Sequence, residues 1–170
     1  DARWSDLVAI NQRREQGAIA ERPLGTIFQG VATRVSRPIL AVPGSAVPDL
    51  QRVMLAYDGS PKAREALYVL RHMLRQWRVA GLVISVGETG ASEAELSRAE
   101  MYLREANPVD LQILHEDGPV DEAILAAMER ESAQMLLMGS YGYAPVIKVF
   151  AGSTVDRILR RAWFPVMICK

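Results

Sequence analysis

The sequence is poor in cysteine, in net charge and in long apolar runs. Its single cysteine, Cys169, cannot form an intramolecular disulfide or a cysteine-rich zinc site, which favours a reducing compartment such as the cytoplasm. Twenty basic side chains balance twenty acidic ones, so a partner held by bulk electrostatics, such as nucleic acid or an anionic membrane, is not expected. No apolar run approaches the roughly 18 residues of a membrane span.

Familiar catalytic signatures are missing as well. The chain contains no G-x4-G-K-[ST], G-x-G-x-x-G, HExxH or G-x-S-x-G pattern. His115, with Glu116 and Asp117 beside it, resembles an acid–base or metal cluster, but a polar strand end leading into a turn explains it too. His72 is interpreted as a partly exposed helix residue. These observations limit the case for an enzyme.

Apolar residues make up 49% of the chain and follow two alternating patterns. Five short, nearly continuous apolar segments are typical of strands covered on both faces. Helix-period stripes separate them, and the first stripe runs from Ala63 to Trp77. The β-α-β-α-β-α-β-α-β order predicts an α/β fold, an open five-stranded parallel sheet with helices on both faces. The predicted strands are 53–57, 82–86, 111–114, 135–138 and 166–169.

Helix starts are marked by capping residues. Ser60 is a good N-cap for the first helix. Ser92 and Glu95 have the spacing of a capping box, as do Ser153 and Asp156. These signals indicate where three of the four predicted helices begin.

The first fifty residues partly repeat the end of the chain. Gly25 aligns with Gly152 at an offset of 127 residues, and Arg37–Val42 then faces Phe164–Cys169. The chain starts at Asp1 rather than Met and has no leader, so we expect it to be cut from a longer tandem protein. We interpret residues 1–43 as the strand–helix–strand remnant of a first domain, 44–51 as a linker, and 52–170 as a complete second copy.

Two loops that follow predicted strands carry glycine and hydroxyl residues. Parallel sheets bind ligands beyond the carboxyl ends of their strands, where the strand order reverses. Glycines admit backbone N–H groups close to a phosphate, and a helix N-terminus adds further donors. Taken singly, the same residues are also ordinary turn glycines and helix caps. The loops are Asp58-Gly59-Ser60, and a G-x2-G-x9-G-S-T motif formed by Gly139, Gly142, Gly152, Ser153 and Thr154.

Together these loops resemble those of the universal stress protein family, over 52–170 in full and over the first-copy remnant as a tail. The resemblance implies a Rossmann-like domain with strand order 3-2-1-4-5. It also implies that ATP or AMP, with or without Mg²⁺, binds between strands one and four. The residues that would surround its phosphates and ribose are Gly139, Gly142, Gly152, Ser153 and Thr154.

The same resemblance assigns the other end of the nucleotide. Asp58, followed by Gly59 and Ser60, would lie near the adenine, and Val86 would contact the base. Ser85 departs from the pattern, because many family members carry His there.

The first-copy remnant departs more strongly. Asn11 and Arg14 stand where the loop glycines belong, and Gly25-Thr26 alone survives of the phosphate end, so we expect no nucleotide there. The family's fifth strands commonly pair between two domains. Ile39–Val42 is therefore expected to pair with Val166–Cys169, either within one chain as a pseudo-dimer or between chains as a homodimer.

Few cations are available to meet phosphate charge. Lys148, in the nine-residue loop, either meets a phosphate or is a solvated loop lysine. Arg157, Arg160 and Arg161 cluster at the end of the last helix, where cations suit the helix dipole, and need no nucleic-acid site. Cys169 is interpreted as a small buried apolar residue.

Three hypotheses follow for function. The leading one is an adenine-nucleotide-binding regulatory module of the stress response, with slow ATP hydrolysis at most. A second is a structural or dimerisation module that binds no nucleotide. A third is an ATPase, which would need more positive charge than the loops supply.

Overall fold

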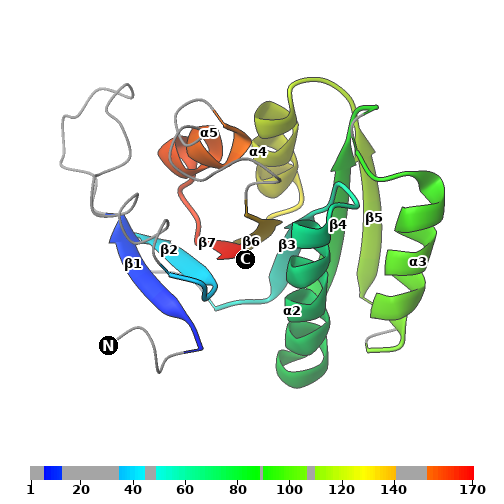
Figure 1. Cartoon of the computed structure of the whole chain (residues 1–170), viewed down its shortest axis with the longest axis horizontal. Coiled ribbons are helices and arrows are strands. Elements are labelled where there is room, and N and C mark those ends of the chain that lie inside the picture. Colours follow the sequence, from blue (N-terminus) through cyan, green and yellow to red (C-terminus); the bar gives the residue numbers. More distant parts are fainter. Residues whose placement is uncertain (1–5, 13–34, 45–48, 89, 107–109, 141–152) are drawn as a thin grey trace.

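The computed structural model describes residues 6–12, 35–44, 49–88, 90–106, 110–140 and 153–170 (Figure 1). Seven strands and four helices lie in these ranges. The strands are β1 (Val8–Gln12), β2 (Ile39–Pro43), β3 (Arg52–Ala56), β4 (Ala80–Val86), β5 (Leu111–Glu116), β6 (Met135–Gly139) and β7 (Val166–Cys169). The helices are α2 (Pro61–Trp77), α3 (Glu93–Arg104), α4 (Val120–Arg130) and α5 (Thr154–Arg161).

The strands form one mixed sheet in the order β1-β2-β7-β6-β3-β4-β5. All neighbours from β7 to β5 pair in parallel. When β3 to β7 are numbered one to five and counted from the β5 edge, their order is 3-2-1-4-5. This confirms the predicted open parallel sheet. The order reverses between β3 and β6, and a ligand site is expected at the carboxyl ends of these two strands.

Two N-terminal strands widen this sheet. β2 pairs with β7 in antiparallel orientation, and β1 pairs with β2 in parallel. The expected pairing of Ile39–Val42 with Val166–Cys169 is thus found within one chain, and the whole sheet has seven strands rather than five. Ile39 and Ala41 are fully buried, and burial of an isoleucine side chain contributes about 1.5–3 kcal/mol. The helix expected in the remnant falls on 13–34, outside the described residues.

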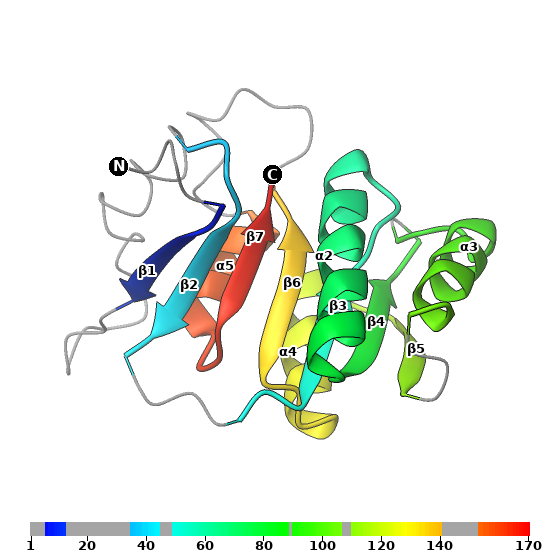
Figure 2. The same ribbon diagram turned by 90° about the horizontal axis from the view of Figure 1, so that it is seen from below.

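Helices cover both faces of the sheet. Figure 2 shows α2 and α3 on one side and α4 and α5 on the other. Successive residues of β3 alternate between these layers: Val53 and Leu55 pack with α2, whereas Met54 packs with the α4 and α5 side. No helix in the described ranges is long and apolar enough to cross a membrane.

The helix starts follow the capping signals. The side chains of Ser60 and Ser153 accept the third backbone N–H of α2 and α5, and Ser92 with Glu95 forms a complete capping box on α3. α4 begins after Pro119 without a side-chain cap. Three of the four helix starts are therefore specified by local chemistry.

One part of the predicted apolar stripe on α2 is wrong. Trp77 is 58% exposed, whereas Met73, which the stripe omitted, is buried. The helix ends at Trp77, and the next residue, Arg78, adopts a left-handed conformation with φ 54°. The sheet therefore covers the stripe only as far as Leu74.

Candidate functional site

An open cavity of about 390 Å³ lies at the carboxyl ends of β3 and β6, where the strand order reverses. This volume is within the usual range for small-molecule sites, about 300–1,000 Å³. The described wall comes from the β3–α2 loop, the ends of β4 and β6, and the beginnings of α4 and α5. Six of the nine residues expected at the site line it: Asp58, Ser60, Val86, Gly139, Ser153 and Thr154.

The other three expected residues have different outcomes. Gly59 is described, but the cavity lining does not include it. Gly142 and Gly152 belong to the 141–152 segment, outside the described residues, and so does Lys148. The phosphate motif is thus described at its two ends, Gly139 and Ser153-Thr154.

The loop between β3 and α2 is held by its own polar groups. The Asp58 carboxylate accepts the backbone N–H of Ser60 at 3.0 Å. The Ser60 hydroxyl in turn accepts the backbone N–H of Ala63 at 3.1 Å. Gly59 has φ 75°, a conformation that favours glycine. The N-terminus of α2, with its favourable dipole for anions, is therefore presented to the cavity.

Glu95 closes this loop from the side of α3. It accepts the Ser92 hydroxyl at 2.8 Å and the Ser92 backbone N–H at 3.1 Å, and lies 3.5 Å from Arg64 of α2. The hydrogen bonds from Ser92, the side-chain bond first, lower the pKa of Glu95, so the carboxylate stays ionised at neutral pH. Glu95 thereby joins the beginning of α3 to α2.

Gly139 has a packing role that the sequence did not indicate. A Cβ atom at this position would lie 2.7 Å from the backbone nitrogen of Ala63 and from the carbonyl carbon of Lys62. Backbone atoms cannot yield as a flexible side chain can, so only glycine admits this approach of β6 to α2. The glycine that the motif assigns to a phosphate also brings two walls of the cavity together.

An apolar wall faces these polar loops. It is formed by Ile84 and Val86 of β4, Ile124 of α4 and Met138 of β6. Sequence reasoning identified only Val86 among them. Val120 of α4 lines the cavity too. Its four-residue spacing from Ile124, on the first turns of α4, is the signal that could have located this wall. A flat apolar group such as a nucleobase suits such a surface.

Ser85, on β4, holds the loop that follows this strand and lines part of the cavity. Its side chain is buried, and its hydroxyl accepts the backbone N–H of Ala91 at 2.9 Å. The adjacent Gly90 lines the cavity, and a Cβ there would collide with the Ser85 hydroxyl. Ser85 thus shapes the β4–α3 loop.

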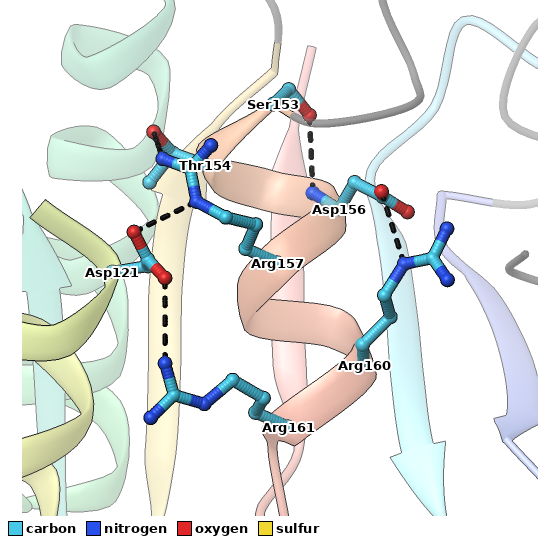
Figure 3. Close-up of polar contacts among 7 residues, drawn as sticks. All are labelled: Asp121, Ser153, Thr154, Asp156, Arg157, Arg160 and Arg161. Atoms are coloured by element: carbon cyan, nitrogen blue, oxygen red, sulfur yellow. Dashed lines mark hydrogen bonds and ion pairs between the residues drawn. The ribbon is translucent and has the colours of Figure 1, made fainter. Parts of the chain in front are cut away.

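The beginning of α5 also lines the cavity, and Figure 3 shows its polar contacts. The Ser153 hydroxyl accepts the backbone N–H of Asp156 at 3.1 Å. Arg157 donates to the Thr154 hydroxyl through Nη2 at 3.4 Å. Through Nε it also donates to the carboxylate of Asp121 on α4 at 2.8 Å. The first turn of α5 is therefore attached to α4 beside the cavity.

Asp121 is a buried carboxylate that sequence reasoning missed. Its side chain is only 8% exposed, and it also lies 3.5 Å from Arg161, while Arg160 pairs with Asp156 at 3.0 Å. The arginine cluster thus has specific acidic partners in addition to its favourable place at the end of the helix. Asp121 lies in the first turn of α4, where acidic residues are common, so the sequence gave no indication of its contact with the arginines.

Two groups at the end of β7, the Cys169 thiol and the Lys170 ammonium, have shifted pKa values. Cys169 is 1% exposed, as expected of a small core residue, and burial, with a smaller effect from Glu65, raises its pKa to about 12. The ammonium of Lys170 donates to the Val35 carbonyl at 2.5 Å, and burial, then the charge of Lys62, lowers its pKa. Lys170 therefore joins the last strand to the segment before β2.

The histidines lie away from the cavity. His72 is exposed on α2, and His115 is exposed on β5. Glu116 beside it pairs with Arg130 at 2.6 Å. No group of three or more His, Cys, Asp or Glu residues in the described part of the chain is arranged to hold a metal ion.

Comparison with known proteins gives one family. The universal stress protein family matches residues 50–170. A universal stress protein of Thermus aquaticus is 31% identical over 134 residues, which are 69% of this chain and 97% of that protein. One of Synechocystis sp. is 26% identical over 166 residues, 95% of this chain but 57% of that protein.

Solved structures agree with this fold. A universal stress protein from Archaeoglobus fulgidus superposes with a TM-score of 0.81 and 28% identity, covering 97% of this chain and 60% of that one. A universal stress protein in complex with cAMP superposes with a TM-score of 0.59 and 19% identity, covering 70% and 95%. The chain thus spans 57% and 60% of its Synechocystis and Archaeoglobus relatives.

Proposed function

The chain belongs to the universal stress protein family, and we propose that it binds an adenine nucleotide, ATP or AMP, in the cavity between β3 and β6. The observation that carries the proposal is the meeting of two helix N-termini and an apolar wall in one cavity. Ser60 begins α2 beside Asp58, at the end assigned to the base, and Ser153 begins α5; both line it. The backbone N–H groups and hydroxyls at the beginning of α5 suit phosphate oxygens.

The apolar wall of the cavity suits a base. Ile84 and Val86 offer an apolar surface, and Asp58 is a hydrogen-bond acceptor at its edge. A carboxylate oxygen can accept a hydrogen bond from an exocyclic amino group, such as that of adenine. The solved cAMP complex of a universal stress protein supports the proposal, because an adenine nucleotide binds to a protein of this fold.

We propose a binding role without rapid hydrolysis. The described residues that line the cavity include no Lys, Arg or His. Fast phosphoryl transfer needs positive charge on the transferred group. Mg²⁺ that arrives with ATP would bind mainly through phosphate oxygens, and Asp58 is the sole carboxylate in the described lining. Membership of the universal stress protein family supports a regulatory role in the stress response, and the single cysteine favours the cytoplasm as its compartment.

Calorimetric titration of the purified chain tests the proposal. ATP and AMP should release heat with one site per chain. Denatured protein fresh from purification should also release adenine nucleotide, identified by absorbance and mass. The absence of both heat and thermal shift with millimolar ATP or AMP would overturn the proposal.

A structural role is the second candidate, because β2 is built into the sheet. Ile39 and Ala41 are fully buried against the α4 and α5 side of the core. Under this alternative, changes at the cavity leave function intact, while changes in β2 or β7 abolish assembly. The same titration separates the two candidates.

A further inference from the structure

We propose that Arg157 is a positioning residue for the phosphate end of the bound nucleotide. It would fix the Thr154 hydroxyl as a hydrogen-bond donor toward the cavity and bring positive charge beside it. This inference rests on the proposed nucleotide binding and deepens it, because it names a residue outside the glycine motif that would distinguish a phosphorylated ligand from a nucleoside.

The partner of the Thr154 hydroxyl determines whether this hydroxyl donates or accepts the hydrogen bond. A guanidinium group has donors and no acceptor, so in the 3.4 Å contact Arg157 must donate and Thr154 must accept. The hydroxyl hydrogen of Thr154 is then directed elsewhere. Because Thr154 lines the cavity, this hydrogen is available to an acceptor there, and a phosphate oxygen is such an acceptor.

Asp121 fixes the guanidinium in this orientation. Its carboxylate oxygen accepts Nε of Arg157 at 2.8 Å, a short charge-assisted bond. Figure 3 shows Arg157 reaching from α5 to Asp121 on one side and Thr154 on the other. Since the guanidinium is planar, the bond at Nε also determines where Nη2 points.

Arg157 places positive charge beside Thr154. Arg157 and Arg161 both contact the carboxylate of Asp121. The Arg157 side chain is 44% exposed, and a solvated anion can approach it. A phosphate next to Thr154 would therefore meet a cation within one helical turn.

Arg161 provides a matched comparison. It contacts the same carboxylate at 3.5 Å but lies seven residues beyond Thr154, about 10 Å along the helix axis. Replacing either arginine by methionine keeps most of the aliphatic side chain and removes one ion pair to Asp121. Only the Arg157 change removes the contact with Thr154.

The test compares ATP with adenosine, by calorimetry, in the wild type, R157M, R161M and R157K. For R157M we expect ATP affinity to fall about tenfold, as for loss of a hydrogen bond to a charged group, with adenosine affinity changed less than twofold. R161M should leave both affinities within twofold. R157K keeps the charge and one donor, and should recover part of the loss.

Thermal melting separates a structural effect from this role. Both methionine variants should melt at lower temperature, because each weakens the hold on a buried carboxylate. Equal losses of ATP and adenosine affinity in R157M, or an R161M loss as large as that of R157M, would overturn the role of Arg157. If the wild type binds no nucleotide, the proposed function fails and this inference with it. Binding by the wild type with unchanged ATP affinity in R157M refutes the inference alone.

Discussion

The carboxylate of Glu95 lies directly against Gly59. A Cβ atom at Gly59 would stand 2.8 Å from the carboxyl carbon and from both oxygens of Glu95. The same carboxylate completes the capping box of α3 with Ser92. One residue therefore completes the cap of α3 and packs against the loop that carries Asp58.

Replacing Gly59 by alanine should cost more than replacing another glycine of similar conformation. Gly87 has φ 65° and no atom within 4 Å of an added Cβ, so G87A should show the left-handed strain alone, roughly 1–2 kcal/mol. G59A adds the displacement of Glu95, about another 1 kcal/mol. Chemical denaturation measures both. The additional E95A change should remove the excess cost in G59A, and equal losses in the two glycine variants would contradict the contact.

Gly139→Ala should destabilise the chain even without ligand. The added Cβ would meet backbone atoms of Lys62 and Ala63 at 2.7 Å, and forcing β6 away from α2 should cost about 1–3 kcal/mol. Gly44→Ala, where the nearest atom is 4.0 Å away, serves as the control and should change stability by less than about 1 kcal/mol. Equal denaturation midpoints for the two variants would show that the close approach is not maintained in solution.

The sequence predicted elements well and contacts between distant elements poorly. Continuous apolar runs and capping serines are local signals, and they located five parallel strands and three helix starts. The loops after strands one and four could be assigned to one site because parallel strands end at the same edge of the sheet. The contact of Arg157 with Asp121 spans 36 residues and depends on how α4 and α5 pack, which no local pattern encodes.

The same limit explains one error and one omission. Trp77 continues the stripe of α2 in sequence but lies where the helix ends, so helix length relative to the sheet decides its exposure. The assignment of Gly139 to phosphate binding stays a prediction, and its packing against Lys62 and Ala63, which the sequence did not indicate, is visible only in three dimensions. Local chemistry therefore predicted which residues gather at the site, and packing determines which of them touch.

The capping serines offer a test of the anion end. Ser153 and Ser92 both cap helices by accepting a backbone N–H, so each change to alanine should cost about 1 kcal/mol of stability. Ser153 lines the cavity, whereas Ser92 is not among the lining residues. S153A should lower ATP affinity several-fold, and S92A should change it less than twofold, as measured by calorimetry. Equal effects on affinity would contradict a phosphate end at α5.

Cys169 should make stability fall at alkaline pH. Burial raises its pKa in the folded chain to about 12 from an ordinary 9.0, so the native state keeps the thiol while the unfolded state ionises. This contribution is complete below pH 9 and is lost between about pH 9 and 12, at up to about 1.4 kcal/mol per pH unit. C169A should flatten this alkaline slope. In the wild type at pH 8, a thiol reagent should react only after unfolding, and rapid labelling of the native chain would contradict the burial.

Neutralising Asp121 should move stability and ATP affinity in opposite directions. D121N keeps an acceptor oxygen for Arg157 but leaves two guanidinium groups without a negative charge between them. Because these side chains are 44% and 52% exposed, the loss of stability should be modest, about 1–2 kcal/mol. ATP affinity should rise about two- to fivefold at low salt, since the anion replaces the lost carboxylate as partner of Arg157. The gain should shrink as the salt concentration increases.

E116Q controls for the change in total charge. Glu116 pairs with Arg130 at 2.6 Å and is not among the lining residues of the cavity, so its neutralisation alters net charge equally without freeing a cation at α5. Its ATP affinity should stay within twofold of the wild type. A purely architectural role for Asp121 predicts the opposite of our expectation, a loss of ATP affinity that parallels the loss of stability. The sign of the affinity change in D121N thus decides whether the carboxylate competes with the ligand for Arg157 or merely joins α4 to α5.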